Sequence, residues 1–382
     1  MSWPLVKLKE CCTITMGQAP KGDTYNTEGQ GYALIAGAGD FGFEKPKPKK
    51  FTSKPTRLSD EGDIILCIRA TIGDINWSDM TYCLGRGVAG LKPQPTLDAL
   101  YLWYFIKVNK RQLESEGTGS TFKQVSRSHV ENWKIPLPPL PEQKRIAAIL
   151  DKADQLRQKR QQAITLADDF LRSVFLDMFG DPVTNPKGWE RVSIDCIALK
   201  VTDGEHQTPK REDRGYKLLS ARNIQQGYIN TTTEKVDYVG EKEFQRISKR
   251  LTIEQGDVLI SCSGTIGRVS VNTLNEQFCL VRSVAVIKLD RTKVLPNYLM
   301  VFLQTVYLQL VMQKEANSSS QKNLFQNQIK KLKILTPPIE QQEIFVAKYQ
   351  KYSTIKSKIQ DISHVDNTLF NALSQKAFAG EL

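Results

Sequence analysis

The sequence predicts an α+β protein in which one domain followed by one long helix occurs twice, with pseudo-twofold symmetry. Matching motifs recur along the 382 residues at an offset that drifts from about 184 to about 199 positions. Short apolar runs bounded by Gly and Asp predict strands in each copy, and longer apolar stretches predict helices. Two further segments have the spacing of a coiled coil. Together these observations predict two duplicated α/β domains separated by two long antiparallel coiled-coil helices.

The repeat divides the chain into four segments. We expect a first domain at 1–140, a central long helix at 141–182, a second domain at 183–339 and a C-terminal long helix at 340–382. The two domains, here called lobes, carry net charges of +4 and +8, while both helical segments are neutral. A basic surface favours a polyanion as partner. The charge therefore predicts two anion-binding lobes joined by helices that face protein.

Strands and helices of the two lobes can be matched motif by motif. "LSDEGDIILCIRATIGDI" (58–75) corresponds to "LTIEQGDVLISCSGTIGRV" (251–269), with Gly-Asp before the apolar run and Thr-Ile-Gly after it. Such runs indicate buried strands. The stretches 96–115 and 295–314 are predicted helices, and Thr96 or Asp98 suits the N-cap of the first.

Both long segments show an apolar seam. Steps of three and four residues give a mean period of 3.5, which is typical of a coiled coil. Each helix could pack on its own lobe, but pairing the two helices buries both seams at once, so we expect pairing. Each helix would span about 36 residues, or about 54 Å. The seam residues of the first are Ile146, Ile149, Ala153, Leu156, Ala163, Ala167, Phe170 and Val174, and those of the second are Phe345, Tyr352, Ile355, Ile359, Ile362, Leu369 and Leu373.

Motifs for catalysis or cofactor binding are missing from the sequence. The seven cysteines form no CxxC pair, and the three histidines belong to no HExxH motif, so we expect no metal site. There is no GxxxxGK[ST] loop for a triphosphate and no Asn-Pro-Pro-aromatic tetrad of an adenine methyltransferase. No run is apolar enough to span a membrane, and the start lacks a secretion signal. We therefore expect a cytoplasmic, non-enzymatic chain that has no membrane partner.

Polar segments at matching places in the two lobes suggest binding instead. The segments 117–140 and 316–339 precede the two long helices, and the loops 15–29 and 201–213 lie near the start of each lobe. Lys and Gln or Asn side chains suit guanine and adenine edges, and Arg, Lys and hydroxyl groups suit phosphates. Each residue alone could be a solvated surface charge, but as matched sets they favour contact with nucleic acid. The predicted DNA-binding residues are Lys21, Arg69, Arg86, Lys123, Gln124, Arg127, His206, Lys210, Arg222, Asn223, Arg268, Arg282, Gln321, Lys322 and Asn323.

The order of motifs resembles the specificity subunit of type I restriction-modification systems over essentially the whole chain. The resemblance rests on "PLPPLPEQKRIAAILDKAD" (136–154), "FLDMFGDPVTNPKGWE" (175–190), "PPIEQQ" (337–342) and the closing "KAFAGEL" (376–382). It implies that each lobe is a target recognition domain reading one half of a bipartite sequence in double-stranded DNA. The paired helices would set the gap and dock two methyltransferase (modification) subunits.

The same resemblance implies that the chemistry belongs to partner subunits. S-adenosylmethionine is expected on the modification subunits, with ATP and Mg²⁺ on restriction or motor subunits, and no cofactor on this chain. The alternative reading is a coiled-coil assembly scaffold whose basic lobes bind protein or RNA. A self-contained methyltransferase or nuclease is disfavoured by the missing cofactor and phosphate loops.

Overall fold

The computed structural model describes residues 3–119, 123–232, 234, 236–317 and 322–382, except for the side chains of 317, 363–365 and 367. The chain forms two compact units. Unit 1 is Met1–Ala163 together with Ile359–Leu382, and unit 2 is Ile164–Lys358. Each unit therefore combines one lobe with parts of both long helices.

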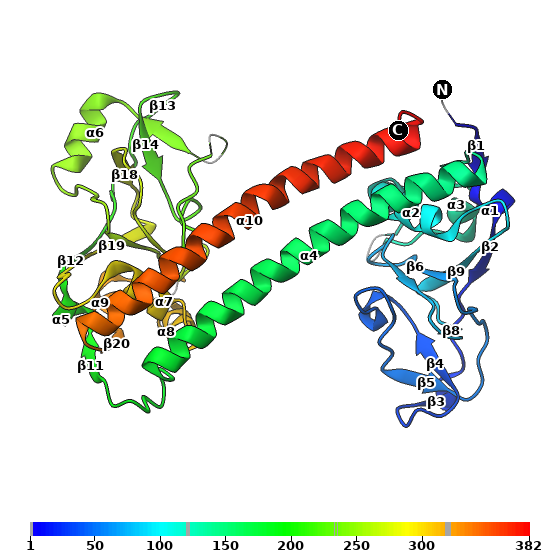
Figure 1. Ribbon diagram of the computed structural model, residues 1–382, viewed down its shortest axis with the longest axis horizontal. Helices are drawn as coiled ribbons and strands as arrows, with labels where there is room; N and C mark the ends of the chain where they lie inside the picture. Colours follow the sequence, from blue (N-terminus) through cyan, green and yellow to red (C-terminus); the bar gives the residue numbers. More distant parts are fainter. Residues whose placement is uncertain (1–2, 120–122, 233, 235, 318–321) are drawn as a thin grey trace. The chain divides into compact units, whose positions relative to one another are not determined.

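Unit 1 contains two four-stranded sheets and a short strand pair (Figure 1). One sheet, here called the inner sheet because the lobe helices cover it, has the order β2 (Cys12–Met16), β9 (Val88–Pro93), β6 (Ile64–Cys67), β7 (Ile75–Trp77). All of its strand pairs are antiparallel. The outer sheet has the order β3 (Tyr25–Asn26), β5 (Lys50–Thr52), β4 (Tyr32–Ile35), β8 (Cys83–Leu84), and β4 pairs with β8 in parallel. Strand β1 (Leu5–Lys7) pairs with β10 (Lys134–Pro136).

Helices cover the inner sheet of unit 1. They are α1 (Leu8–Cys11), α2 (Ala99–Ser115) and α3 (Arg127–Asn132), with short 3₁₀ turns η1 (Gly22–Thr24) and η2 (Ala38–Asp40) in the loops. Helix α2 begins at Asp98, whose carboxylate accepts a hydrogen bond from the backbone N–H of Tyr101 at 3.0 Å. This satisfies one of the free N–H groups of the first turn. The predicted cap at Asp98, rather than Thr96, is thus confirmed.

Unit 2 repeats the strand order of unit 1. Its inner sheet is β12 (Ala198–Asp203), β19 (Val284–Leu289), β16 (Val258–Ser261), β17 (Val269–Val271), and its outer sheet is β13 (Arg211–Glu212), β15 (Asp237–Val239), β14 (Tyr216–Leu219), β18 (Phe278–Leu280). The parallel pair recurs between β14 and β18, and β11 (Glu190–Ser193) pairs with β20 (Lys333–Thr336). The helices α5 (Ile194–Ile197) and α9 (Gln326–Lys331) take the places of α1 and α3. The predicted duplication is confirmed.

Unit 2 differs from unit 1 in two helical regions. Helix α6 (Glu241–Ser248) lies between β15 and β16. The helix predicted at 295–314 is two helices, α7 (Pro296–Leu303) and α8 (Val306–Asn317). At the break the Thr305 hydroxyl donates to the Phe302 carbonyl at 2.7 Å, and the Gln304 amide donates to the Val269 carbonyl at 3.0 Å. Because Thr and Ser hydroxyls compete for helix carbonyls, this side-chain bonding ends α7 there.

The long helices are α4 (Leu140–Phe179) and α10 (Ile339–Ala379), and they run antiparallel within each unit (Figure 1). In unit 1 the Arg157 guanidinium lies 4.7 Å from the centre of the Phe370 ring. In unit 2 the ring centroids of Phe175 and Phe345 are 5.4 Å apart. The predicted pairing is confirmed, and each helix also packs on the lobes.

The predicted seam is wrong in detail. Leu156 is 46% exposed and Phe170 is 67% exposed, whereas Asp154 and Phe175 are buried. On α10 Leu369 is likewise 52% exposed, although it was expected in the seam. Because each helix packs against both a lobe and the other helix, its buried surface is broader than a coiled-coil seam. It includes Ile146 and Phe345 of the predicted seam, which are fully buried, together with residues outside that seam.

A buried glutamine in the first turn of each long helix bonds to the Pro-rich segment that precedes it. The Gln143 side chain is fully buried, accepts from the Asp98 N–H at 2.8 Å, and donates to the carbonyls of Thr96 (2.9 Å) and Pro138 (2.8 Å). Gln342 is also fully buried and repeats these three bonds with Leu295 N–H (2.9 Å), Lys293 carbonyl (3.0 Å) and Pro337 carbonyl (2.9 Å). Each glutamine therefore fastens a long helix to the loop that begins the preceding lobe helix.

Candidate nucleic-acid interface

Three predicted contact residues of the first lobe come together at the end of β6. Arg69 forms a β-bridge with Gln124, and the Ala70 N–H donates to the Lys123 carbonyl at 3.0 Å. The side chains of Arg69, Lys123 and Gln124 are all exposed. Two segments more than 50 residues apart in the sequence thus present one polar surface.

The second lobe has the same arrangement with different side chains. Ser263 forms a β-bridge with Asn323, and the Leu324 N–H donates to the Cys262 carbonyl at 2.9 Å. Lys322 is exposed beside this bridge. Lys322 and Asn323 are therefore the structural equivalents of Lys123 and Gln124. Gln321 lies outside the described residues.

The turns that carry Arg69 and Arg268 correspond, but the two arginines do not. Arg69 is equivalent to Ser263, since both follow the central strand by two positions and pair with the segment before α3 or α9. The Arg268 carbonyl instead accepts a hydrogen bond from the Ser261 N–H at 2.9 Å. In the first lobe the Asp74 carbonyl accepts the equivalent bond from the Cys67 N–H at 2.7 Å, so Arg268 is equivalent to Asp74. Arg268 thus lies on the returning arm of its turn and is half-buried.

Arg86 and Arg282 occupy equivalent positions in the two lobes. The Ile68 N–H donates to the carbonyl of the residue after Arg86 at 2.9 Å, and the Cys262 N–H donates to the carbonyl of the residue after Arg282 at 2.8 Å. Both arginine side chains are exposed. This pair matches in residue type as well as in position.

The remaining candidates lie apart from these clusters. Lys21 and Lys210 are exposed in the first and second polar loops. Other exposed candidates have acidic partners: Arg127 with Glu131 at 3.1 Å, His206 with Asp203 at 3.0 Å, and Arg222 with Asp237 at 2.7 Å.

Asn223 differs from the other candidates because it is buried. Its side-chain oxygen accepts from the Ser220 N–H at 2.9 Å, and its amide donates to the Asn230 carbonyl at 3.0 Å. In the first lobe the Asp40 carboxylate accepts from the Ala36 N–H at 2.9 Å in the same turn. Asn223 and Asp40 therefore shape equivalent loops.

A hollow of about 360 Å³ opens beside Arg69. Of the described residues that line it, Arg69 alone has a charged side chain, and main chain and methyl groups form most of the remaining wall. Its lining residues are Ala36, Gly37, Ala38, Gly39, Arg69, Ala70, Thr71 and Gly87. At Gly87 an added Cβ would lie 2.2 Å from the Ala36 carbonyl oxygen, so the two walls approach closely there.

The backbone beside Arg69 has an unfavourable conformation. Ala70 has φ of 64°, in the left-handed region that costs a non-glycine residue about 1–2 kcal/mol. The equivalent residue of the second lobe, Gly264, has φ of 71° and takes this conformation without that cost. Such strain is often found where a side chain must be held in a particular direction. Here it fixes the path of the chain immediately after Arg69.

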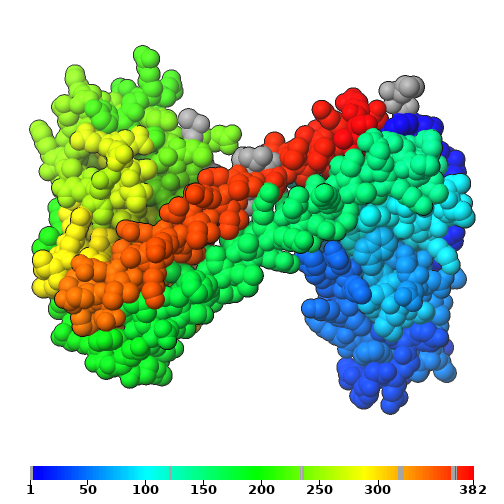
Figure 2. All heavy atoms as spheres, viewed as in Figure 1, coloured from blue at the N-terminus to red at the C-terminus, as the bar shows by residue number. Residues whose placement is uncertain are grey.

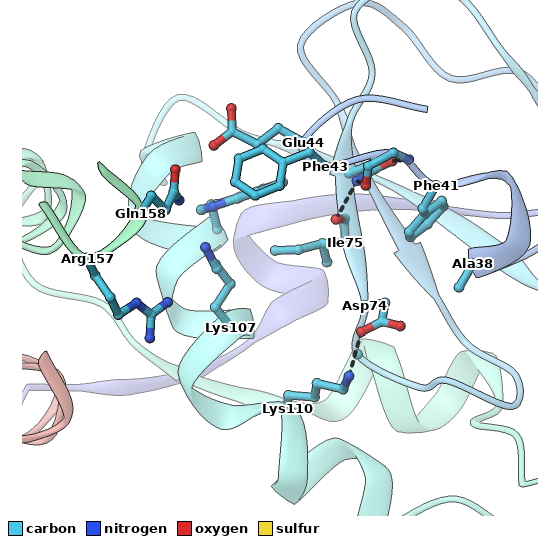
Figure 3. Close-up of a pocket in the computed structure, with 14 residues that line it drawn as sticks. Ala38, Phe41, Phe43, Glu44, Asp74, Ile75, Lys107, Lys110, Arg157 and Gln158 are labelled. Atoms are coloured by element: carbon cyan, nitrogen blue, oxygen red, sulfur yellow. Dashed lines mark hydrogen bonds and ion pairs between the residues drawn. The ribbon is translucent and has the colours of Figure 1, made fainter. Parts of the chain in front are cut away.

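A second hollow of unit 1, about 530 Å³ in volume, lies between α2, α4 and the loop before β5 (Figure 3). Lys107 and Lys110 reach it from α2, and Arg157 reaches it from α4. All three cations have carboxylate partners. The distances are 2.7 Å for Lys107–Asp154, 2.5 Å for Arg157–Asp154 and 2.5 Å for Lys110–Asp74. This hollow therefore offers less uncompensated charge to an anion than the surface around Arg69.

The carboxylate of Asp154 is buried behind this hollow, with 2% of its side chain exposed. Burial alone raises the pKa of Asp154, but the ion pairs with Lys107 and Arg157 outweigh it, so the pKa lies below its ordinary value. The Asp154 cluster is thus an electrostatic link between α4 and α2. Charge spacing along the chain gave no sign of the link to α2, because Lys107 and Asp154 are 47 residues apart.

Within the described ranges, no cluster of His, Cys, Asp or Glu has the arrangement needed to hold a metal ion. The helices of the described part of the chain are also too short or too polar to cross a membrane.

Comparisons with known proteins identify the family. The model of the type I restriction modification DNA specificity domain matches residues 2–166 and 186–363. The protein named as the MjaX specificity subunit of Methanocaldococcus jannaschii is 36% identical over 180 residues, which cover 46% of this chain and 42% of that relative. The EcoBI specificity subunit of Escherichia coli is 21% identical over an alignment covering 100% of this chain and 86% of that relative.

Solved structures agree on the fold. The type I restriction-modification S subunit from M. genitalium aligns with a TM-score of 0.64 and 15% identity, over 98% of this chain and 96% of that one. The expected fold class and the expected role as a non-catalytic DNA-recognition subunit are confirmed. With two copies of the specificity domain along its length, the chain belongs to the type I restriction-modification DNA specificity family.

Proposed function

We propose that the two lobes bind double-stranded DNA and that each reads one half of a bipartite target, while the paired helices set the gap and hold two modification subunits. The observation that carries this proposal is the pair of equivalent cationic surfaces. Lys123 with Arg86 in one lobe and Lys322 with Arg282 in the other occupy the same positions of one fold. Two copies of a phosphate-binding surface suit two similar segments of duplex backbone.

Removal of one cationic side chain should affect one half-site only. Lys322→Ala is expected to weaken protection of the second half-site in a footprint and to leave the first half-site protected, because the two lobes have separate contact surfaces. Lys123→Ala is the matched control and should give the reciprocal pattern. Equal loss at both halves, or unchanged protection at both, would contradict the assignment of one lobe to each half.

The binding to DNA should depend steeply on salt. Each phosphate contact releases counterions, so affinity falls as the salt concentration rises. If the chain is instead a scaffold whose lobes bind protein, its affinity for duplex DNA should not change with the salt concentration in this way. A titration of duplex DNA against the full chain at several salt concentrations separates the two functions, and a matched RNA duplex tests the remaining alternative.

Docking of modification subunits is supported by the apolar side chains that the long helices leave uncovered. In unit 2 Leu166 is 69% exposed, Phe170 is 67% exposed and Ile355 is 56% exposed. In unit 1 Leu156 and Leu369 are 46% and 52% exposed. Figure 2 shows segments of both helices at the molecular surface. Large apolar side chains gathered on neutral helices are typical of a protein-binding surface.

A charge placed on this surface should disrupt assembly. Phe170→Asp is expected to weaken association with the modification subunit by about 10- to 100-fold, since an aromatic side chain at an interface centre commonly contributes about 2 kcal/mol or more. Folding should be unaffected because Phe170 is exposed. Arg172→Asp on the same helix is the control and should change association little. Wild-type assembly of Phe170→Asp in analytical ultracentrifugation would rule out this part of the helix as a docking surface.

A further inference from the structure

The two lobes can be compared position by position because they share one fold. The DNA backbone is chemically the same in both halves of a target, whereas the bases differ between them. Contacts to phosphate should therefore use the same residue type at equivalent positions, and contacts to bases should not. Arg86 and Arg282 match, as do Lys123 and Lys322. Among these cationic positions Arg69 differs, because its equivalent is the uncharged Ser263, and its bridge partner Gln124 likewise has Asn323 as its equivalent.

Arg69 is held firmly by its backbone and is open at its side chain. Its carbonyl accepts bonds from the Thr71 N–H at 2.9 Å and from the Cys67 thiol at 3.2 Å. The bridge to Gln124 fixes it on the other side. No carboxylate of the described residues lies within ion-pair distance of the Arg69 guanidinium. No side-chain hydrogen bond of Arg69 is found in the described part of the chain either, so within it the five N–H donors can bind a ligand.

The surroundings of Arg69 suit the flat edge of a base. The hollow beside it is about 360 Å³ and is lined by the methyl groups of three alanines and by glycine main chain. Added Cβ atoms at Gly37 and Gly39 would meet nothing within 4 Å, so this wall is open to solvent and to a ligand. A guanidinium above an apolar, uncharged wall can donate two parallel bonds to a planar acceptor pair.

We propose that Arg69 reads a guanine in the half-site bound by the first lobe, with its guanidinium donating to N7 and O6 on the major-groove edge. Arginine bonded in this bidentate way is the commonest specific contact to guanine. The second lobe has a serine at this position and reads its half-site in another way. This inference rests on the proposed function and names the residue and base through which the first lobe gains part of its specificity.

The matched arginine Arg86 provides the contrast. It lies one residue before Gly87, which lines the same hollow. The equivalent residue of the other lobe, Arg282, is also an arginine. We assign Arg86 to phosphate. The two arginines of one surface thus differ in the kind of contact they make, and this difference can be measured.

The test is selection of duplexes from a randomised library by the full chain, followed by sequencing, for wild type, Arg69→Ala, Arg69→Lys and Arg86→Ala. Wild type should show a guanine preference at a position in the half-site that Lys123→Ala loses from the footprint. Arg69→Ala should reduce this preference about 5- to 150-fold, and other positions should keep theirs. Arg69→Lys keeps the charge but lacks the planar fork, so it should weaken the guanine preference and keep most of the affinity.

Arg86→Ala should lower affinity for all sequences alike and reduce the slope of log affinity against log salt by about 1. The inference is overturned if Arg69→Ala has this uniform effect, which indicates a phosphate contact, or if it leaves every base preference as in wild type. A wild-type chain that selects no sequence overturns the proposed function, and this inference with it. Thermal unfolding of each variant should match wild type, since both side chains are exposed.

Discussion

Replacement of Gln342 by leucine is expected to destabilise unit 2 by about 3–5 kcal/mol. Leucine has a similar volume but can make none of the three bonds of the amide. The Leu295 N–H and the carbonyls of Lys293 and Pro337 would then lose their partner in a buried site. A buried polar group without a partner costs about 1–3 kcal/mol, and three such groups are affected.

The neighbouring glutamine is a matched control for this substitution. Gln341 belongs to the same turn of α10 but is exposed, so Gln341→Leu should change stability by less than about 0.5 kcal/mol. Gln143→Leu should have the same large effect in unit 1 as Gln342→Leu has in unit 2. Urea unfolding of the three variants measures the difference. Equal stability of the Gln341 and Gln342 variants would show that the amide bonds do not hold the helix to its lobe.

Removal of the Asp154 carboxylate should be the second large effect, at about 3 kcal/mol for Asp154→Ala. The carboxylate is buried, and its loss would leave the cations of Lys107 and Arg157 close together without compensation. This loss of folding free energy is smaller than the largest losses seen when a buried ion pair is broken. The reason is that 29% of the Lys107 side chain and 36% of the Arg157 side chain are exposed, so solvent screens both cations. Asp177→Ala on the exposed side of α4 is the control and should have little effect.

The same carboxylate makes unit 1 sensitive to acid. Because the pKa of Asp154 is lowered in the folded state, its stabilisation is complete above the ordinary pKa of 3.8 and is lost as the pH falls below it. Wild type should therefore lose more stability than Asp154→Asn between about pH 5 and pH 2. Thermal unfolding at a series of pH values measures this. Parallel curves for the two proteins would refute the contribution of Asp154.

Much of the fold follows from local sequence signals. Matched Gly-Asp and Thr-Ile-Gly motifs predicted the two copies, because the strand and turn between them need the same residues in each lobe. Thr96 and Asp98 were the two candidate caps before an apolar helix, and the structure uses Asp98. Arg86 and Arg282 were both predicted as contact residues, and the structure places them, exposed, at equivalent positions of the two lobes.

Features that depend on tertiary contact were not predicted. The seam of α4 was placed on a face that includes Phe170, because periodicity shows which residues are apolar but not which of two packing partners covers them. The break after α7 arises from bonds that Gln304 and Thr305 make after folding. The difference between Arg69 and Arg268 required the hydrogen-bond register of both turns. No spacing in the sequence shows that register.

The discontinuity of unit 1 has a consequence for how the chain matures. Its core includes Phe370 and Ala377 from α10, which are translated some 200 residues after the lobe they complete. Unit 2 is one continuous stretch, Ile164–Lys358, and all of its residues have been made before those two appear. Domains usually fold in the order in which they leave the ribosome. Here the lobe that is synthesised first is the last to be finished, and until then a nascent chain leaves uncovered the side of α2 on which Tyr104 and Phe105 contact Phe370 and Phe378.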